Sequence, residues 1–235
     1  MNFQAYFPRM IITIDGPAGA GKSTVSKQLA KRLGYLYLDT GAMYRAVAVQ
    51  VQAEGIDPND EIALEKLCQG LEISFRQGEE EQQVICQGKD VTKKIRDPEV
   101  GWLASVVSTR GPVRRTLVNL QRKMGQQGGI VAEGRDTGTV VFPEAPFKFY
   151  LDAQPAERVR RRYQELLAKG VQVAMGEVRK EVEKRDQQDT SRELAPLCPA
   201  RDAHIIDSTG LGVGEIVERM LAVIQEDKKG LGGKS

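Results

Sequence analysis

The sequence predicts an α/β protein in which a doubly wound, five-stranded parallel sheet is flanked by helices and carries two insertions, a small antiparallel β segment and a helical lid. Three observations lead to this prediction. Short apolar runs alternate with segments of helical periodicity along most of the 235 residues, which is typical of parallel sheets. A glycine-rich loop joins the first apolar run to the first helical segment. Between residues 71 and 92 the apolar period changes to two, which indicates an antiparallel hairpin.

The glycine-rich loop has the pattern G-x-x-x-x-G-K-[ST], which is the phosphate-binding loop of P-loop NTPases. A strand predicted at residues 9–14 precedes it and a helix predicted at 23–33 follows it, as that motif requires. Glycines allow the backbone N–H groups to approach phosphate oxygens at the helix N-terminus. Lys22 is placed to reach the β- and γ-phosphates, and Ser23 to offer its hydroxyl to Mg²⁺. The residues predicted to bind ATP are Gly16, Pro17, Ala18, Gly19, Ala20, Gly21, Lys22, Ser23 and Thr24.

The second strand is predicted at residues 35–38, and a helix follows it with Thr40 as its N-cap. Tyr44 and Arg45 lie in the first turns of this helix, so a second anion site is possible there. A short helix is expected at 61–68. The hairpin comprises residues 71–75 and 84–86, is joined by the acidic linker 78–81, and continues at 90–92.

The rest of the chain again alternates helices and strands. Helices are predicted at residues 98–108 and from 111 to about 128, strands at 130–132 and 148–151, helices at 152–167 and 177–189, a fifth strand at 203–207 and a last helix at 213–224. Trp102 and the single histidine, His204, are interpreted as packing residues. In such a sheet, ligands bind at the carboxyl ends of the strands.

Bulk properties narrow the class of protein. A hydrophobic content of 40% supports a substantial core, and a net charge of +2 gives no reason to expect a nucleic-acid partner. No apolar run is long enough to span a membrane, and Cys68, Cys86 and Cys198 are predicted to be reduced thiols of a cytoplasmic protein. We expect a monomer with a flexible lead-in at 1–8, one domain at 9–225 with an insertion at about 60–97 and a lid at about 154–193, and a flexible tail at 226–235.

Arginines are dense between residues 158 and 192. Arg185, Asp189 and Arg192 have the spacing of one helix face, if the helix continues that far, and Asp189 is predicted to pair with Arg185. A polar helical hairpin with arginines suits a lid that closes over a phosphoryl group and neutralises its charge. Arg160, in contrast, is interpreted as part of a solvated helix face.

Arg45 and Arg135 each follow a strand end or a helix start, and both are suited to bidentate contacts with a phosphate. Asp136 is an unusual neighbour for such an arginine. One interpretation is that its carboxylate accepts a hydrogen bond from an exocyclic amine, which cytosine offers and uracil does not. The alternative is that Asp136 pairs with Arg135 or with another neighbour.

Several segments together resemble the bacterial cytidylate kinases. They are residues 12–17, 38–45, 133–143, 185–189 and 195–197, and they occur in family order over about residues 11–224. The resemblance implies the nucleoside monophosphate kinase fold, in which the hairpin is a monophosphate-binding insertion. It also implies transfer of the ATP γ-phosphate to CMP and dCMP with Mg²⁺.

The resemblance assigns roles to individual positions. Lys22, Arg158, Arg185 and Arg192 would be catalytic, and Ser23 would contact the metal. Arg135 would hold the acceptor phosphate, and Asp136 the base amine. The CMP-binding residues would be Thr40, Tyr44, Arg45, Ser105, Arg114, Arg135, Asp136, Asp189 and Arg192.

The residues leave two alternatives open. The first is a kinase on the same fold that acts on another nucleotide or on a small metabolite. The second is a P-loop switch or ATP-binding adaptor without transfer activity, which needs switch loops that respond to the γ-phosphate.

Overall fold

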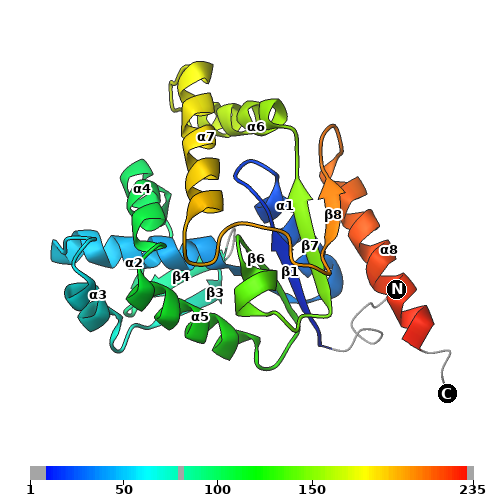
Figure 1. Cartoon of the computed structure of the whole chain (residues 1–235), viewed down its shortest axis with the longest axis horizontal. Helices are drawn as coiled ribbons and strands as arrows, with labels where there is room; N and C mark the ends of the chain where they lie inside the picture. Colours follow the sequence, from blue (N-terminus) through cyan, green and yellow to red (C-terminus); the bar gives the residue numbers. More distant parts are fainter. Residues whose placement is uncertain (1–8, 79–81, 232–235) are drawn as a thin grey trace. The chain divides into compact units, whose positions relative to one another are not determined.

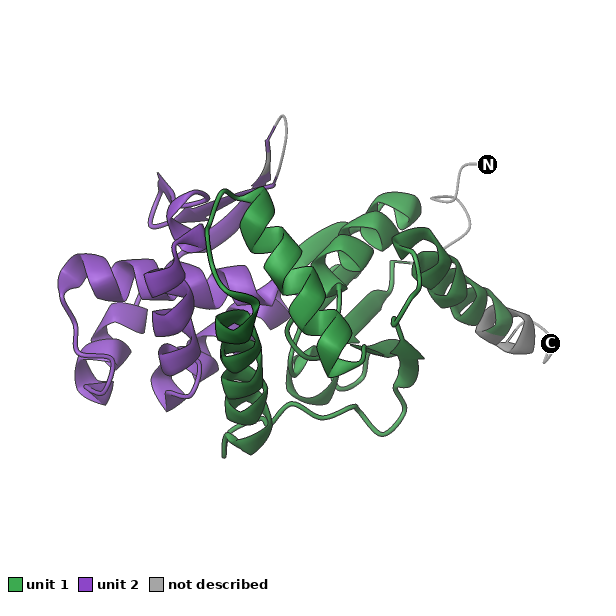
Figure 2. Ribbon diagram, turned by 90° about the horizontal axis from the view of Figure 1, so that it is seen from above, with its two compact units in different colours: residues 1–38, 127–235 green, residues 39–126 purple. Residues whose placement is uncertain are grey.

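The computed structural model describes residues 9–78 and 82–231. The predicted lead-in at 1–8, most of the acidic linker at 79–81 and the last four residues lie outside this part. The chain divides into two compact units, which Figure 2 colours separately. Unit 1 comprises residues 1–38 and 127–235, and unit 2 comprises residues 39–126. The insertion predicted at about 60–97 lies within unit 2.

Unit 1 is built on a five-stranded sheet with the order β2-β6-β1-β7-β8. Strand β1 pairs in parallel with β6 and with β7, and β7 pairs in parallel with β8. The prediction of a five-stranded parallel sheet is therefore confirmed (Figure 1). The strands are β1 (Ile11–Asp15), β2 (Leu36–Asp39), β6 (Ile130–Gly134), β7 (Phe147–Asp152) and β8 (His204–Asp207).

Two helices, α1 (Lys22–Leu33) and α8 (Val213–Leu231), share an apolar core with this sheet. Ile12 and Phe149 of the sheet, Leu29 of α1 and Met220 of α8 are all buried in it. Helix α1 ends at Gly34, which adopts the left-handed conformation that glycine tolerates. The central strands are buried on both faces, which explains why their sequences read as continuous apolar runs.

Helix α8 continues to Leu231, beyond the predicted end of the last helix at residue 224. Residues 226–229 (Glu-Asp-Lys-Lys) are polar, which suggested a flexible tail. Glutamate and lysine are also good helix formers, so a helix anchored by its apolar stripe can extend through them.

Unit 2 contains the predicted antiparallel insertion. Strand β4 pairs antiparallel with β3 and with β5, so the hairpin is confirmed as a three-stranded sheet. The helices differ in two details from the predictions. Asp39, not Thr40, is the N-cap of α2, because its side chain accepts a hydrogen bond from the Ala42 N–H at 2.8 Å. The elements are α2 (Thr40–Glu54), α3 (Glu61–Cys68), β3 (Ile73–Gln77), β4 (Gln82–Cys86), β5 (Lys89–Asp90), η2 (Lys94–Arg96), α4 (Pro98–Val107) and α5 (Gly111–Gly125).

The second difference is Trp102, which is 61% exposed and does not belong to the core. Helix α4 buries Val100, Ala104 and Val107, and Trp102 lies off this stripe. A helix start at Pro98 was predicted correctly, but the periodicity of a short apolar helix does not distinguish its two faces. His204 is also exposed, on the edge strand β8, with its ring centroid 5.7 Å from that of Phe149.

The predicted helical hairpin consists of α6 (Pro155–Ala168) and α7 (Met175–Ser191), which belong to unit 1. Val159 of α6 and Val178 and Val182 of α7 form a small core of their own. Helix α7 ends at Ser191, so Arg192 lies just outside it and does not share its face with Arg185 and Asp189 as expected. The backbone of Arg192 is extended, and its Nε donates to the carbonyl oxygen of Ala195 at 2.6 Å.

Gly16 tests the close packing at the start of the phosphate-binding loop. A Cβ there would lie 2.0 Å from the carbonyl oxygen of Leu151, and φ is +149°. We expect Gly16→Ala to lower the Tm by more than about 10 °C or to prevent folding. Gly176, a helical glycine with open space around it, is the matched control. Gly176→Ala should raise stability by up to about 1 kcal/mol in thermal unfolding. Equal Tm values for the two variants would contradict the packing described.

Candidate active site

The phosphate-binding loop connects β1 to α1 in unit 1. Gly19 and Gly21 have φ values of +77° and +90°, which L-residues with side chains rarely adopt. A Cβ at Gly19 would lie 2.8 Å from the carbonyl oxygen of Arg158 on α6. Helix α1 begins directly after Gly21 and has no side-chain cap. Its first N–H groups therefore suit an anionic ligand.

Lys22 is buried at the start of α1, and its Nζ donates to the carbonyl oxygen of Pro17 at 2.7 Å. Burial, followed by the positive charge of Arg135, lowers the pKa of Lys22 to about 7, although Glu133 opposes this shift. An anion beside Lys22 would compensate for both effects, so the site favours a phosphate electrostatically.

Ser23 is bound to the neighbouring strand. Its Oγ donates to Glu133 Oε1 at 2.7 Å, and the hydroxyl of Tyr37 donates to the same oxygen at 2.7 Å. Glu133 is buried near the end of β6, next to β1 in the sheet. Serine and carboxylate oxygens are ligands or outer-sphere partners that suit Mg²⁺. Within residues 9–78 and 82–231, no group of three or more His, Cys, Asp and Glu forms an all-protein metal cage.

A second cluster of charged groups lies at the end of β6 and beside α7. Arg135 Nε donates to Asp189 Oδ2 at 2.6 Å, with both side chains mostly buried. Asp136 Oδ1 lies 3.7 Å from Arg192 Nη2. The structure therefore brings together four of the residues predicted to bind the acceptor.

The pKa values of this cluster reflect its charge balance. Burial alone would raise the pKa of Asp189, yet Arg135, Arg185 and Arg192 together hold it below its usual value. Burial likewise opposes the charge of Arg135, but Asp189 outweighs it and raises the pKa of Arg135. Arg185, the predicted partner of Asp189, thus lowers the pKa of Asp189 through its charge. Arg135 forms the hydrogen-bonded ion pair with Asp189. Asp189 and Arg135 therefore both stay charged.

Arg158 links helices α6 and α7 to the phosphate-binding loop. Its Nη1 donates to Asp186 Oδ2 at 2.6 Å and to the carbonyl oxygen of Ala18 at 3.2 Å. Its Nε donates to the carbonyl oxygen of Ala153 at 3.1 Å. Arg158 is buried on α6, and its place beside the phosphates of a nucleotide stays a prediction.

The remaining predicted residues lie in unit 2. The guanidinium carbon of Arg114 lies 6.0 Å from the ring centroid of Tyr44, and Arg114 Nη1 donates to the carbonyl oxygen of Ser108 at 3.2 Å. Arg45 pairs with Asp39 across the first turns of α2 at 3.2 Å. Thr40 is buried at the start of this helix. Ser105 lies on α4, where its carbonyl oxygen accepts a hydrogen bond from the hydroxyl of Ser108.

Comparison with known proteins identifies the family. The sequence model of the family described as cytidylate kinase matches residues 12–226. The chain belongs to the cytidylate kinase family. It is 51% identical over 217 residues to the cytidylate kinase of Citrifermentans bemidjiense, which covers 92% of this chain and 93% of the relative. It is 49% identical to the cytidylate kinase of Geobacter sulfurreducens, over 95% of this chain and 96% of the relative.

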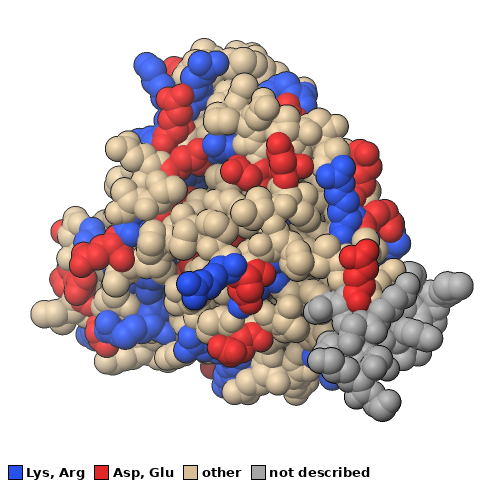
Figure 3. Space-filling model, turned by 45° about the vertical axis from the view of Figure 1, so that its right-hand side comes forward, with Lys and Arg blue, Asp and Glu red and all other residues tan. Residues whose placement is uncertain are grey.

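A solved structure supports the fold alone. An uncharacterized protein from Eubacterium ventriosum superposes with a TM-score of 0.50 at 11% identity, covering 92% of this cytidylate kinase family member and 98% of the other chain. None of the described helices is long and apolar enough to cross a membrane. On the face drawn in Figure 3, acidic and basic side chains are interspersed.

Three site residues of this cytidylate kinase family member were not predicted from its sequence. Glu133 contacts Ser23, and Asp186 contacts Arg158. Asp15 accepts hydrogen bonds from the Thr137 N–H and hydroxyl at 2.8 Å and from the Gly138 N–H at 2.7 Å. It thereby fastens the segment after Asp136 to the strand that enters the phosphate-binding loop. Burial raises the pKa of Asp15, although these donors oppose the shift. The sequence signal that could have revealed Asp15 and Glu133 is the acidic residue at or next to the end of each core strand.

The pKa of Lys22 leads to a prediction about proton uptake. At pH 8.5 a Lys22 with a pKa of about 7 is mostly neutral, whereas the phosphates of ADP are fully ionised. Bound phosphates favour the charged ammonium, so binding of ADP should take up about one proton per site, and affinity should fall as pH rises above 7. Titration calorimetry in two buffers of different ionisation enthalpy measures this uptake. Lys22→Met should abolish it, and no uptake by the unaltered protein would contradict the lowered pKa.

Proposed function

We propose that this member of the cytidylate kinase family transfers the γ-phosphoryl group of ATP to CMP and dCMP, releasing CDP or dCDP and ADP. The observation that carries the proposal is that unit 1 contains two sets of residues suited to binding anions. The first is the glycine loop with Lys22, and the second is the buried Arg135–Asp189 pair with Asp136 and Arg192. The names of the relatives support CMP as the acceptor.

The glycine loop is proposed as the donor site. The residues from Gly16 to Thr24 would bind the phosphates of ATP through backbone N–H groups and Lys22. Magnesium would be held by the Ser23 hydroxyl together with the nucleotide phosphates, and Glu133, which accepts the Ser23 hydrogen bond, would orient that hydroxyl. The metal would supply positive charge between the phosphates, as in other phosphoryl-transfer enzymes.

The acceptor is proposed to contact the charged residues at the end of β6 in unit 1. Arg135 would hold its phosphate, and Asp136 would accept a hydrogen bond from the cytosine amine. Asp136 is buried, and its Oδ1 lies 3.7 Å from Arg192 Nη2. This contact restrains the carboxylate, which supports a role in distinguishing cytosine from uracil. The other residues proposed to bind CMP are Thr40, Tyr44, Arg45, Ser105, Arg114, Asp189 and Arg192.

Phosphoryl transfer needs positioning and charge stabilisation more than covalent chemistry. Lys22, Arg158, Arg185 and Arg192 are proposed to neutralise the charge that spreads over the equatorial oxygens of the moving group. Arg158 is suited to this role because it contacts both the donor loop at Ala18 and the lid residue Asp186. The family relationship does not favour the two alternatives, a kinase for another small molecule or a switch without transfer activity.

The cellular setting is also a proposal. Cys68, Cys86 and Cys198 are free thiols, as is usual for proteins of the reducing cytoplasm. We propose a cytoplasmic monomer because one chain carries both anion-binding sets. Light scattering during size-exclusion chromatography would distinguish a monomer from a dimer.

A coupled assay tests the proposed function. Purified protein with ATP, Mg²⁺ and either CMP or dCMP should form the diphosphate and ADP in equal amounts. Omission of Mg²⁺ should abolish the reaction, because the charge between the phosphates is then uncompensated. UMP and AMP should react with a much smaller kcat/KM. Failure to phosphorylate CMP, or faster reaction with UMP or AMP, would reject the proposal.

Asp136 tests the basis of base selection. An asparagine can donate a hydrogen bond to the O4 of uracil, so Asp136→Asn should lower the ratio of kcat/KM for CMP over UMP by about tenfold or more. Glu218, an exposed acid on α8 paired with Arg32 near the end of α1, provides the control, since Glu218→Gln removes the same charge at a position outside this cluster. The control should keep the ratio. An unchanged ratio in Asp136→Asn would exclude this side chain from base recognition.

A further inference from the structure

Three backbone carbonyl oxygens of the phosphate-binding loop accept hydrogen bonds from side chains. Pro17 accepts from Lys22, Ala18 from Arg158, and Ala20 from Arg161 and from the hydroxyl of Ser208. All peptide bonds of the described chain are trans. In a trans peptide the C=O group and the following N–H point in opposite directions. A donor that holds a carbonyl outward therefore aims the next N–H toward the inside of the loop.

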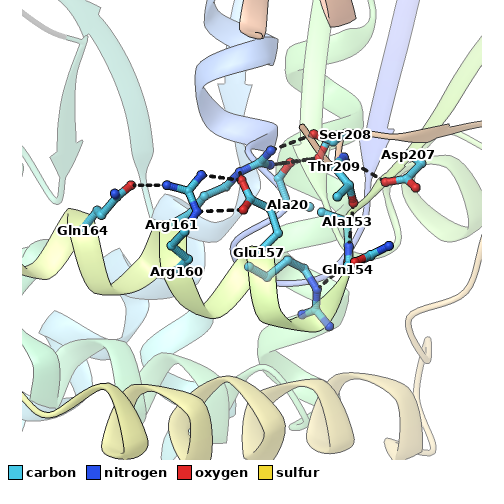
Figure 4. Close-up of polar contacts among 11 residues, drawn as sticks. Ala20, Ala153, Gln154, Glu157, Arg160, Arg161, Gln164, Asp207, Ser208 and Thr209 are labelled. Atoms are coloured by element: carbon cyan, nitrogen blue, oxygen red, sulfur yellow. Dashed lines mark hydrogen bonds and ion pairs between the residues drawn. The ribbon is translucent and has the colours of Figure 1, made fainter. Parts of the chain in front are cut away.

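Arg161 makes the most extensive of these contacts. Its Nη1 donates to the Ala20 carbonyl at 3.3 Å and to Ser208 Oγ at 2.9 Å, and its Nη2 donates to the Ser208 carbonyl at 2.7 Å. Ser208 is fully buried, and its Oγ donates to the Ala20 carbonyl at 3.1 Å. One guanidinium thus joins α6, the phosphate-binding loop and the segment after β8 (Figure 4).

Glu157 fixes the guanidinium itself. Its Oε1 accepts from Arg161 Nε at 2.9 Å on the same helix. This hydrogen bond within α6 restrains the long Arg161 side chain, so less rotamer freedom is lost when a ligand binds. The neighbouring segment is held as well, because the Gln154 N–H donates to the Thr209 hydroxyl at 2.9 Å.

We propose that Arg161, acting with Ser208, is a positioning residue that orients the Ala20–Gly21 peptide so that the Gly21 N–H faces a bound nucleotide phosphate. This inference rests on the proposed binding of ATP to the loop. Gly21 has a φ of +90° and no side chain, so the local sequence does not fix the orientation of the peptide between Ala20 and Gly21. Arg161 and Ser208 provide that restraint from two distant parts of the chain.

Arg160 is a matched control on the preceding residue. It also pairs with Glu157, at 2.7 Å, and donates to Gln164, but both partners lie on its own helix. Arg160→Met and Arg161→Met remove the same charge from adjacent positions and weaken the same carboxylate pair. Only the Arg161 variant loses a contact with the phosphate-binding loop.

The experiment measures Mg·ADP affinity by titration calorimetry and steady-state kinetics for both variants. Arg161→Met should raise the Kd for Mg·ADP and the KM for ATP by on the order of tenfold, since a charge-assisted hydrogen bond to the loop is lost. The KM for CMP should change by less than about twofold. Arg160→Met should stay within about twofold of the unaltered protein in all three values.

Two further variants keep the inference testable if Arg161→Met folds poorly. Arg161→Lys retains the charge but not the fork, so its Kd should lie between those of the unaltered protein and the methionine variant. Ser208→Ala should weaken Mg·ADP binding, and the effect of the Arg161 substitution should be smaller in the Ser208→Ala background.

Three results would overturn the inference. One is a Kd for Mg·ADP in Arg161→Met or Arg161→Lys equal to that of Arg160→Met. The second is an equal rise in the KM values for ATP and CMP together with a lower Tm, which would indicate general structural damage. The third is strict additivity of the Arg161 and Ser208 effects. Mg·ADP binding is measured without CMP, so failure of the unaltered protein to phosphorylate CMP would reject the proposed function and leave this result readable.

Discussion

The structure of unit 1 depends on the close approach of a glycine backbone to β7 and α6. The carbonyl oxygen of Leu151 and the backbone of Arg158 occupy the space that side chains at Gly16 and Gly19 would need. This packing places the phosphate-binding loop over the carboxyl ends of the central strands, where Asp15 and Glu133 also lie. An anion bound to this loop would contact its N–H groups, and the carbonyl oxygens of Ala18 and Ala20 accept hydrogen bonds from other parts of unit 1. Arginines of α6 and the buried Ser208 make these contacts.

A second constraint is the cost of burying charges. The side chains of Lys22, Arg135, Asp189 and Arg192 are all mostly buried, and an unpaired charge there would be strongly destabilising. The arrangement limits this cost by pairing Arg135 with Asp189 and by leaving Lys22 with a lowered pKa. The site is thus held together by charges that a nucleotide phosphate would partly compensate. Binding of a nucleotide phosphate to these groups would therefore also raise the folding stability.

Much of the architecture could be predicted from the sequence. A period of two residues correctly predicted the antiparallel hairpin, and continuous apolar runs predicted the core strands. A period of 3.6 residues predicted the two helices of the expected lid. The motif at Gly16 to Ser23 was correctly placed between a strand and a helix. Local capping was less predictable, since Asp39 and Thr40 are both good N-caps and their backbone conformations decide between them.

The tertiary contacts of charged residues were the least predictable part. Arg160 and Arg161 are neighbours of the same type, and only the fold shows that one contacts its own helix while the other contacts Ala20 and Ser208. Glu133 and Tyr37 are 96 positions apart in sequence, so no local pattern reveals their contact. The end of α7 at Ser191 separated Arg192 from the helix face on which the spacing had placed it.

The central claim is that one chain binds a donor and an acceptor nucleotide with their phosphates directed toward each other. The most direct test is calorimetric binding of adenosine and cytidine joined through five phosphates, compared with ATP and CMP alone. If both sets of residues are engaged at once, the joined compound should bind at least about 100-fold more tightly than either nucleotide, because the second contact becomes intramolecular. An affinity no greater than that of ATP would contradict the claim.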